Sequence, residues 1–187
     1  SSGILSERLN VSKFGLLWAG AQKNIGPAGL VIVIIREDLL GFAREDVPTM
    51  LNYKIMADSG SLYNTPPTYS IYIAGLTFRH LIENGGIAAM EKRNIQKAEI
   101  LYSAIDDSEI FTAPVVKEDR SLMNVVFKSK DEQLDALFIS EAKEAGMVNL
   151  KGHRTAGGMR ASIYNAMPME GVEKLAEFIA EFDRKHR

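Results

Sequence analysis

The chain has 187 residues, of which 46% are hydrophobic and 25% are charged, and its formal net charge at pH 7 is −2. This composition supports a folded core, and the nearly balanced charge favours neither nucleic acid nor a membrane surface as a partner. The absence of cysteine fits a reducing compartment such as the cytoplasm. Charged residues interrupt every apolar run, so no membrane-spanning helix is expected.

Two short apolar runs come first, at residues 14–19 and 30–35. Both are bulky or β-branched and bounded by glycine, which predicts two buried β-strands. The connection between them is too short for a crossover helix, so antiparallel pairing is expected. Two strands cannot bury both of their faces and edges by themselves, so residues 30–35 are predicted to pair with strands from outside this chain.

The connection between these runs carries Gln22 and Lys23, followed by Gly26 and Gly29. A lysine on a tight loop at the edge of a buried sheet is expected to have dry surroundings, which disfavour the ammonium form, as a Schiff-base lysine requires. The amide of Gln22 can donate to a phosphate oxygen without competing for the proton. On spacing alone, a solvated lysine and a loop amide bonded to backbone are the commoner interpretations.

Helical spacing then predicts two consecutive helices. Thr65 is expected to cap the first, with prolines in its first turn, and Gly85 and Gly86 to end it. Asn64 and Thr65 would then lie at a helix N-terminus, which can hold an anion, although simple capping is the commoner role. The second helix carries an apolar stripe made of Ile87, Met90, Ile95, Ala98, Leu101, Tyr102 and Ile105.

The remaining pattern predicts a small α+β domain from about Asn94 onward. Strands are expected at residues 123–127, 147–150 and 159–164. Ser129 and Glu132 match a capping box that would begin a helix, and Pro168 is expected to start the last helix.

Two basic motifs lie in this second part of the chain. His153 and Arg154 follow Gly152, and adjacent donors on a turn suit a dianionic group, although a solvated basic turn is commoner. Arg160 lies in an otherwise small or apolar strand, where an unpaired guanidinium is expensive to bury. Its partner is a bound carboxylate or an acidic residue of the chain, unless this strand face is exposed. Three histidines without clustered ligand spacing argue against a metal site.

Four strings, in order, resemble the phosphoserine aminotransferase family. They are WAGAQKNIGPAGLVIVIIREDLLG at residues 18–41, YNTPPT at 63–68, KGHR at 151–154 and GGMRASIYNAMP at 157–168. The family consists of pyridoxal-phosphate (PLP) enzymes of fold type I, class V, with the aspartate-aminotransferase fold. The resemblance implies an α/β chain, in which residues 1–93 are the C-terminal part of the PLP-binding large domain and residues 94–187 form a small α+β C-terminal domain.

The resemblance also implies how the cofactor, pyridoxal 5'-phosphate, is bound. Lys23 is the residue that would carry the cofactor and act as the catalytic lysine, and Gln22 would contact the cofactor phosphate. Asn64 and Thr65 would reach the cofactor phosphate of the partner in a homodimer.

On the substrate side, the resemblance implies that His153 and Arg154 hold the substrate phosphate and that Arg160 holds the α-carboxylate. The implied reaction converts 3-phosphohydroxypyruvate and glutamate into phosphoserine and 2-oxoglutarate, in serine biosynthesis. Some members of the family also act in pyridoxine biosynthesis.

By the same resemblance, Ser1 falls near the middle of the family's chain. The N-terminal half of the enzyme would carry most of the central sheet, so the isolated chain is expected to be inactive. Two alternatives stay open: another PLP enzyme of the same fold, such as a desulfurase or lyase, and a catalytically inactive fragment that only folds or dimerises. The basic pair His153 and Arg154, with Arg160 six residues on, favours a doubly anionic phosphorylated substrate.

Overall fold

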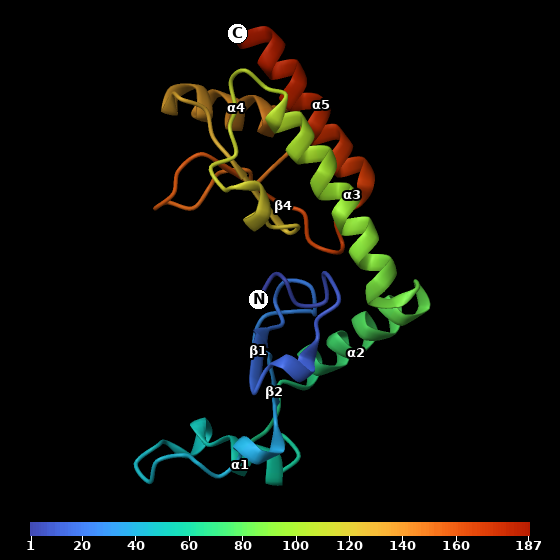
Figure 1. Ribbon diagram of the computed structural model, residues 1–187, viewed down its shortest axis with the longest axis vertical. Coiled ribbons are helices and arrows are strands. Elements are labelled where there is room, and N and C mark those ends of the chain that lie inside the picture. The colour runs from blue at the N-terminus through green and yellow to red at the C-terminus, as the bar shows by residue number, and fades with distance from the viewer. The chain divides into compact units, whose positions relative to one another are not determined.

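The computed structural model describes residues 1–187, which form two compact units. The first unit contains Ser1 and Arg8–Asn84, and the second contains Ser2–Glu7 and Gly85–Arg187 (Figure 1). The expected domain boundary between residues 93 and 94 falls within helix α3 (Gly86–Asp106) and stays a prediction. None of the helices combines the length and apolar character that crossing a membrane requires.

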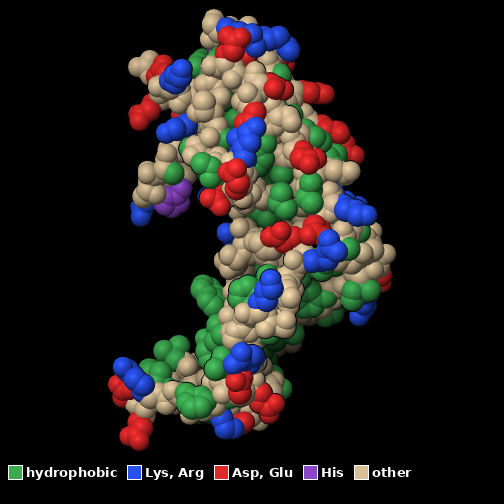
Figure 2. All heavy atoms as spheres, viewed as in Figure 1, with side chains coloured by type: hydrophobic (Ala, Val, Ile, Leu, Met, Phe, Trp, Pro, Cys, Tyr) green, Lys and Arg blue, Asp and Glu red, His purple; other side chains and the backbone are tan.

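The first unit contains an antiparallel pair of strands, β1 (Leu16–Gly20) and β2 (Val31–Ile35), in which Trp18 lies opposite Val33. The predicted antiparallel pairing is confirmed. The predicted burial is wrong for this chain, because Trp18 is 67% exposed and Val31 is 59% exposed. Figure 2 shows apolar side chains gathered on the visible surface of this unit. An apolar sequence indicates that a strand can be buried, but actual burial requires other elements to pack against the sheet. Residues 1–187 do not provide such elements over β1 and β2.

Two α-helices follow in the first unit, α1 (Tyr53–Asp58) and α2 (Thr68–Glu83). Pro67 is the N-cap of α2, so the predicted start at Thr65 is wrong. Thr65 and Pro66 each precede a proline, which disfavours the helical conformation at both positions. The predicted end is confirmed, because α2 stops at Glu83 and Gly85 takes a φ of 91°. Short 3-10 turns lie at Val11–Lys13, Glu37–Leu39 and Thr49–Leu51.

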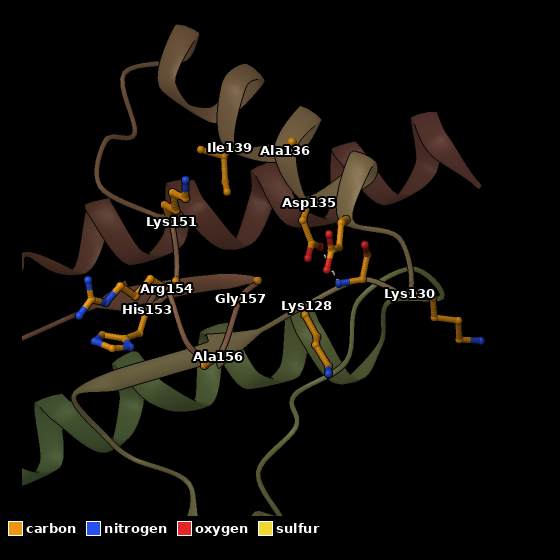
Figure 3. Close-up of a pocket in the computed structure, with 14 residues that line it drawn as sticks. Lys128, Lys130, Asp135, Ala136, Ile139, Lys151, His153, Arg154, Ala156 and Gly157 are labelled. Atoms are coloured by element: carbon orange, nitrogen blue, oxygen red, sulfur yellow. Dashed lines mark hydrogen bonds between the residues drawn. The ribbon is translucent and has the colours of Figure 1, made fainter.

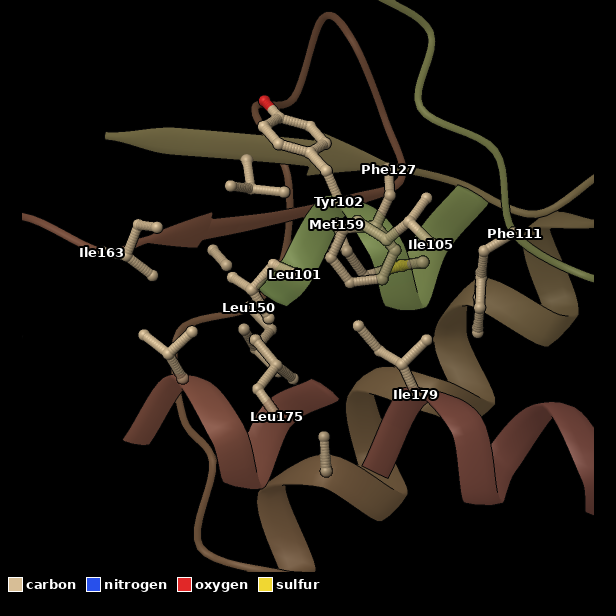
Figure 4. Packing of buried hydrophobic residues seen from close by; sticks show 14 of the residues in the cluster. Leu101, Tyr102, Ile105, Phe111, Phe127, Leu150, Met159, Ile163, Leu175 and Ile179 are labelled. Atoms are coloured by element: carbon tan, nitrogen blue, oxygen red, sulfur yellow. The ribbon is translucent and has the colours of Figure 1, made fainter. Parts of the chain in front are cut away.

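The second unit packs three helices and a two-stranded sheet around one core. Strand β3 (Asn124–Phe127) pairs antiparallel with β4 (Met159–Ser162). Helix α3 lies beside α5 (Met169–His186), and α4 (Glu132–Glu144) completes the unit (Figure 1). A 3-10 turn at Lys117–Asp119 precedes β3. Phe138 has aromatic neighbours on several sides, with ring centroids 5.0–5.6 Å from those of Phe111, Phe127 and Phe182. Figure 4 shows Leu101 and Ile105 of α3 and Leu175 and Ile179 of α5 in the core of this unit.

Two local predictions for the second unit are wrong. The N-cap of α4 is Asp131, whose side chain accepts from Gln133 N, while Ser129 Oγ donates to the carbonyl of Asp131 at 2.7 Å. Asp131 is itself a strong N-cap and lies next to the helix, so it displaces the expected capping box of Ser129 and Glu132. The predicted strand at residues 147–150 is absent, because Asn149 has a φ of 64°, which interrupts an extended run.

The segment Ser2–Glu7 belongs to the second unit, where the side-chain amides of Asn94 and Asn165 hold its backbone. Asn94 Nδ2 donates to the Ser6 carbonyl and to Asn165 Oδ1, both at 2.9 Å. Asn165 Nδ2 donates to the Leu5 carbonyl at 2.9 Å. Asn94 is fully buried on α3, whereas Ile95, expected in the apolar stripe, is 39% exposed. The buried face of α3 therefore includes the polar residue Asn94 as well as most of the predicted apolar residues.

Candidate cofactor and substrate sites

The connection between β1 and β2 folds around the carbonyl of Ala21. This oxygen accepts from the backbone N–H groups of Lys23 at 2.7 Å and Gly26 at 2.8 Å. Ala21 N donates to the Leu30 carbonyl at 2.9 Å, which closes the loop, and Ala21 and Ile25 are buried beneath it. The backbone that carries Lys23 is thus held by hydrogen bonds and by two buried side chains.

Gln22 and Lys23 are both exposed on this loop. The expected dry surroundings of Lys23 are therefore wrong for this chain by itself, since dryness requires a cover over the loop. A Cβ on Gly20 would collide with the side-chain oxygen of Gln22, so the Gln22 side chain folds back over the end of β1. Gly29 has a φ of 98°, a conformation that glycine adopts readily, and turns the chain into β2.

Asn64 and Thr65 lie in the exposed segment before α2 and not at its N-terminus. Asn64 Nδ2 donates to the Thr65 carbonyl at 3.2 Å. Neither residue caps the helix, so this pair does not form the anion site that a helix N-terminus would provide.

Strand β4 presents Arg160 on the face opposite the core, with its Cα paired to that of Val126. The flanking residues Met159 and Ala161 are buried in the core. Arg160 is half-buried, and its Nε is inaccessible to solvent without a hydrogen-bond partner. The internal salt bridge that the sequence left open is not formed in this chain. A buried guanidinium nitrogen without an acceptor is costly, and an external carboxylate would satisfy it.

A polar cluster that local sequence patterns did not predict lies on this same sheet face. Asn124 Oδ1 accepts from Ser162 Oγ and from the Tyr164 hydroxyl, each at 3.3 Å. Asn124 Nδ2 donates to Ser2 Oγ at 3.0 Å. The pairing of β3 with β4 places Asn124 opposite Ser162, and Ser2 reaches this face from the start of the chain, so a local pattern could not predict the cluster.

His153 and Arg154 lie on a loop that closes on itself. Gly152 N donates to the Gly158 carbonyl at 2.8 Å, and Gly157 N donates to the His153 carbonyl at 2.9 Å. A Cβ on Gly152 would collide with the carbonyls of Gly157 and Gly158. The loop is therefore pinched at its base, and glycine is required at position 152 for this contact.

This loop and the start of α4 line a pocket of about 620 Å³ (Figure 3). Figure 3 shows the side chains of His153 and Arg154 extending to one side of the loop, away from Asp135. Asp135 Oδ1 accepts from Ser129 N at 2.8 Å, so this acid is engaged within the chain. The basic residues of the lining are Lys128, Lys130, Lys151, His153 and Arg154. Their excess over Glu132 and Asp135 favours an anionic ligand at the loop.

Residues 1–175 match the family model described as Aminotransferase class-V. The chain belongs to the class-V aminotransferase family. Phosphoserine aminotransferases from Pseudomonas aeruginosa (strain LESB58) and Stutzerimonas stutzeri are 59% and 58% identical to it over 100% of its length. The alignment covers 52% of each relative, so the chain spans about half the length of the curated relatives it matches.

Solved structures agree with this membership. The phosphoserine aminotransferase from Bacillus circulans subsp. alkalophilus matches with a TM-score of 0.96 and 42% identity, over 100% of this chain and 52% of the other. A PLP-bound phosphoserine aminotransferase from Trichomonas vaginalis matches with a TM-score of 0.91 and 40% identity, over 96% and 52% of the two chains. The predicted α/β fold class and the resemblance to the family are confirmed.

Proposed function

We propose that the full-length protein containing this class-V aminotransferase chain is a phosphoserine aminotransferase. It would convert 3-phosphohydroxypyruvate and glutamate into phosphoserine and 2-oxoglutarate, in serine biosynthesis. The observation that carries the proposal is the 59% identity, over the whole chain, to a protein of that name. Residues 1–93 would complete the large domain and residues 94–187 would form the small one.

Pyridoxal 5'-phosphate would be held through Lys23, with Gln22 donating to its phosphate. The donor set fits this group, because a primary amine and a neutral amide stand next to each other on a loop anchored by Ala21. Asn64 and Thr65, whose side chains are exposed, would contact the cofactor phosphate of the partner, as the resemblance to the family implies. When bound, the cofactor supplies an electron sink, while the protein supplies orientation and proton transfer. The amine of Lys23 would move the proton at the substrate Cα.

Arg160 would hold the α-carboxylate that every substrate of this reaction carries. Its buried Nε lacks an acceptor within the chain, and its planar guanidinium can form two parallel hydrogen bonds with a carboxylate. His153 and Arg154 would hold the substrate phosphate, which only one of the two half-reactions involves. Two separate basic sites therefore match two anionic groups of one phosphorylated substrate.

We further propose that the full-length protein is a cytoplasmic homodimer that contains the N-terminal half absent from this chain. Activity in pyridoxine biosynthesis, on a phosphorylated hydroxythreonine, belongs to the same proposal. Apolar side chains of β1 and β2 are exposed in this chain, which supports the proposal that protein outside residues 1–187 packs against these strands.

The test is the transamination of 3-phosphohydroxypyruvate by glutamate, measured on the full-length protein and on a Lys23→Ala variant. In the parent we expect turnover and visible absorbance. Borohydride reduction should also attach the cofactor covalently to Lys23, detected as added mass by mass spectrometry. The Lys23→Ala variant should lose all three signals. Lys13→Ala, at another exposed lysine of the same unit, is the matched control and should keep full activity. Normal turnover by Lys23→Ala would contradict the role of Lys23. Desulfuration or lyase activity without transamination would contradict the proposed reaction.

A further inference from the structure

We propose that Thr155 is a positioning residue that fixes the ring of His153, so that His153 presents an Nε2–H donor to the substrate phosphate. The proposal rests on the proposed function, in which His153 contacts that phosphate. It adds a residue that the sequence did not single out, together with a defined tautomer of the neutral ring.

The contacts at one ring nitrogen carry the proposal. His153 Nδ1 lies 2.7 Å from Thr155 Oγ1, and the backbone nitrogen of Thr155 also points its N–H at Nδ1, at 3.4 Å. An amide N–H can only donate, whereas a hydroxyl can donate or accept. Both groups are satisfied together only if Nδ1 accepts. In a neutral imidazole the single ring proton then sits on Nε2.

The backbone of the loop keeps the two residues in this relation. The His153 carbonyl accepts from Ala156 N and Gly157 N, both at 2.9 Å, so Thr155 lies inside a closed turn. His153 and Thr155 are both exposed, and an exposed ring without such a contact would sample several orientations. The hydroxyl of Thr155 therefore restricts a ring that packing leaves mobile.

The tautomer matters because the proposed ligand is an anion. With the proton on Nε2, a neutral His153 donates toward the side away from Thr155. The other neutral tautomer would direct a lone pair toward the phosphate oxygens, which repels them. Fixing the tautomer before binding removes the cost of selecting it during binding.

The first test reads the ring directly and does not depend on activity. Full-length holoenzyme with nitrogen-labelled histidine is examined by NMR in inorganic phosphate, and His153 is assigned by the signal lost in His153→Asn. We expect a protonated Nε2 and an unprotonated Nδ1 in the parent and in Thr155→Ser. Thr155→Val keeps the branched shape and the long 3.4 Å amide contact but loses the 2.7 Å hydroxyl contact, which is the stronger of the two, so it should show a mixture of tautomers. An unprotonated Nε2 in the parent, or an unchanged ring in Thr155→Val, would overturn the proposal.

The second test separates positioning from general damage. In single-turnover measurements, Thr155→Val should lower kcat/KM for 3-phosphohydroxypyruvate about three- to tenfold, as expected for one lost hydrogen bond, and leave the glutamate half-reaction unchanged. Thr155→Ser should restore the phosphorylated substrate's value. Equal losses in both half-reactions, or no rescue by serine, would refute a role toward the phosphate. A parent protein with the expected ring state but no such activity would refute the proposed function alone.

Discussion

Lys97 donates from Nζ to the carbonyl oxygen of Tyr164 at 2.8 Å, from the middle of α3 to the segment that follows β4. The same Nζ also donates to the carbonyls of Ile163 at 3.0 Å and Met167 at 3.3 Å. Lys97 is fully buried. A buried ammonium thus fixes the chain between the strand of Arg160 and the last helix.

Replacing Lys97 with methionine should lower the free energy of unfolding by about 2–4 kcal/mol at pH 7, because three backbone carbonyls lose a charged donor. Burial, with a smaller contribution from Arg93, lowers the pKa of Lys97 to about 8. Between that pH and the unfolded value of 10.5, the unfolded chain binds more protons, so the parent gains stability as pH rises.

Urea unfolding of the full-length protein between pH 7 and pH 10 measures both effects of Lys97→Met. The difference between parent and variant should widen as pH rises, and Lys92→Met, at an exposed position on α3, should match the parent throughout. A difference that stays constant with pH would contradict the lowered pKa of Lys97.

Asp183→Asn should also destabilise the protein, by about 2–3 kcal/mol at neutral pH, through weakened charge-assisted hydrogen bonds. Asp183 is buried on α5, accepts from Ser108 Oγ at 2.6 Å and Ile110 N at 3.0 Å, and pairs with Arg187. Burial raises the pKa of Asp183, but the hydrogen bonds from Ser108 and Arg187 outweigh it and hold the pKa below its usual value.

A carboxyl with a lowered pKa stabilises the folded state above its unfolded pKa, and this contribution is lost as pH falls through the folded pKa. The effect of Asp183→Asn should therefore shrink as unfolding is measured at progressively more acidic pH. Glu181→Gln, at an exposed position on the same helix, serves as the control. An effect of Asp183→Asn that grows on acidification would rule out this account.

Gly157→Ala and Gly158→Ala form a matched pair on the candidate phosphate loop. Their φ angles are 69° and 60°, so alanine pays a similar backbone cost at both, about 1 kcal/mol. Only at position 158 would the new Cβ also meet a neighbour, with Lys128 Cβ and the Phe127 carbonyl oxygen at 2.7 Å. Gly158→Ala should therefore lower the free energy of unfolding clearly more than Gly157→Ala, in thermal or urea unfolding. Equal losses would show that the close approach is unimportant.

Arg160→Lys and Arg154→Ala should separate the two proposed anion sites. Lysine keeps the charge but loses the planar fork, so kcat/KM should fall on the order of ten- to a hundredfold for both glutamate and the phosphorylated substrate. Arg154→Ala should instead penalise the phosphorylated substrate more than glutamate. Single-turnover measurements of each half-reaction, made on both variants, show which anionic group each arginine contacts. If Arg160→Lys harmed only the phosphorylated substrate, the two roles would be exchanged.

Local pattern predicted elements well where neighbours in the chain decide the conformation. The antiparallel pairing of β1 with β2 followed from their short connection, and the break between α2 and α3 followed from Gly85. The late start of α2 is also local, because two consecutive prolines exclude helix before Pro67. The resemblance to the family likewise depended on short strings and was confirmed over the whole chain.

The sequence by itself therefore determined the family, the order of helices α2 to α5 and which candidate residues share a loop, whereas the short helix α1 was not predicted. Only the tertiary structure decided that Lys97 is buried, that Arg160 Nε lacks an acceptor and that Trp18 is exposed. Each of these outcomes depends on groups distant in the chain: the partners of Lys97 lie 66–70 residues away. Periodicity reports which side chains share a face, whereas burial and hydrogen bonding depend on what packs against that face.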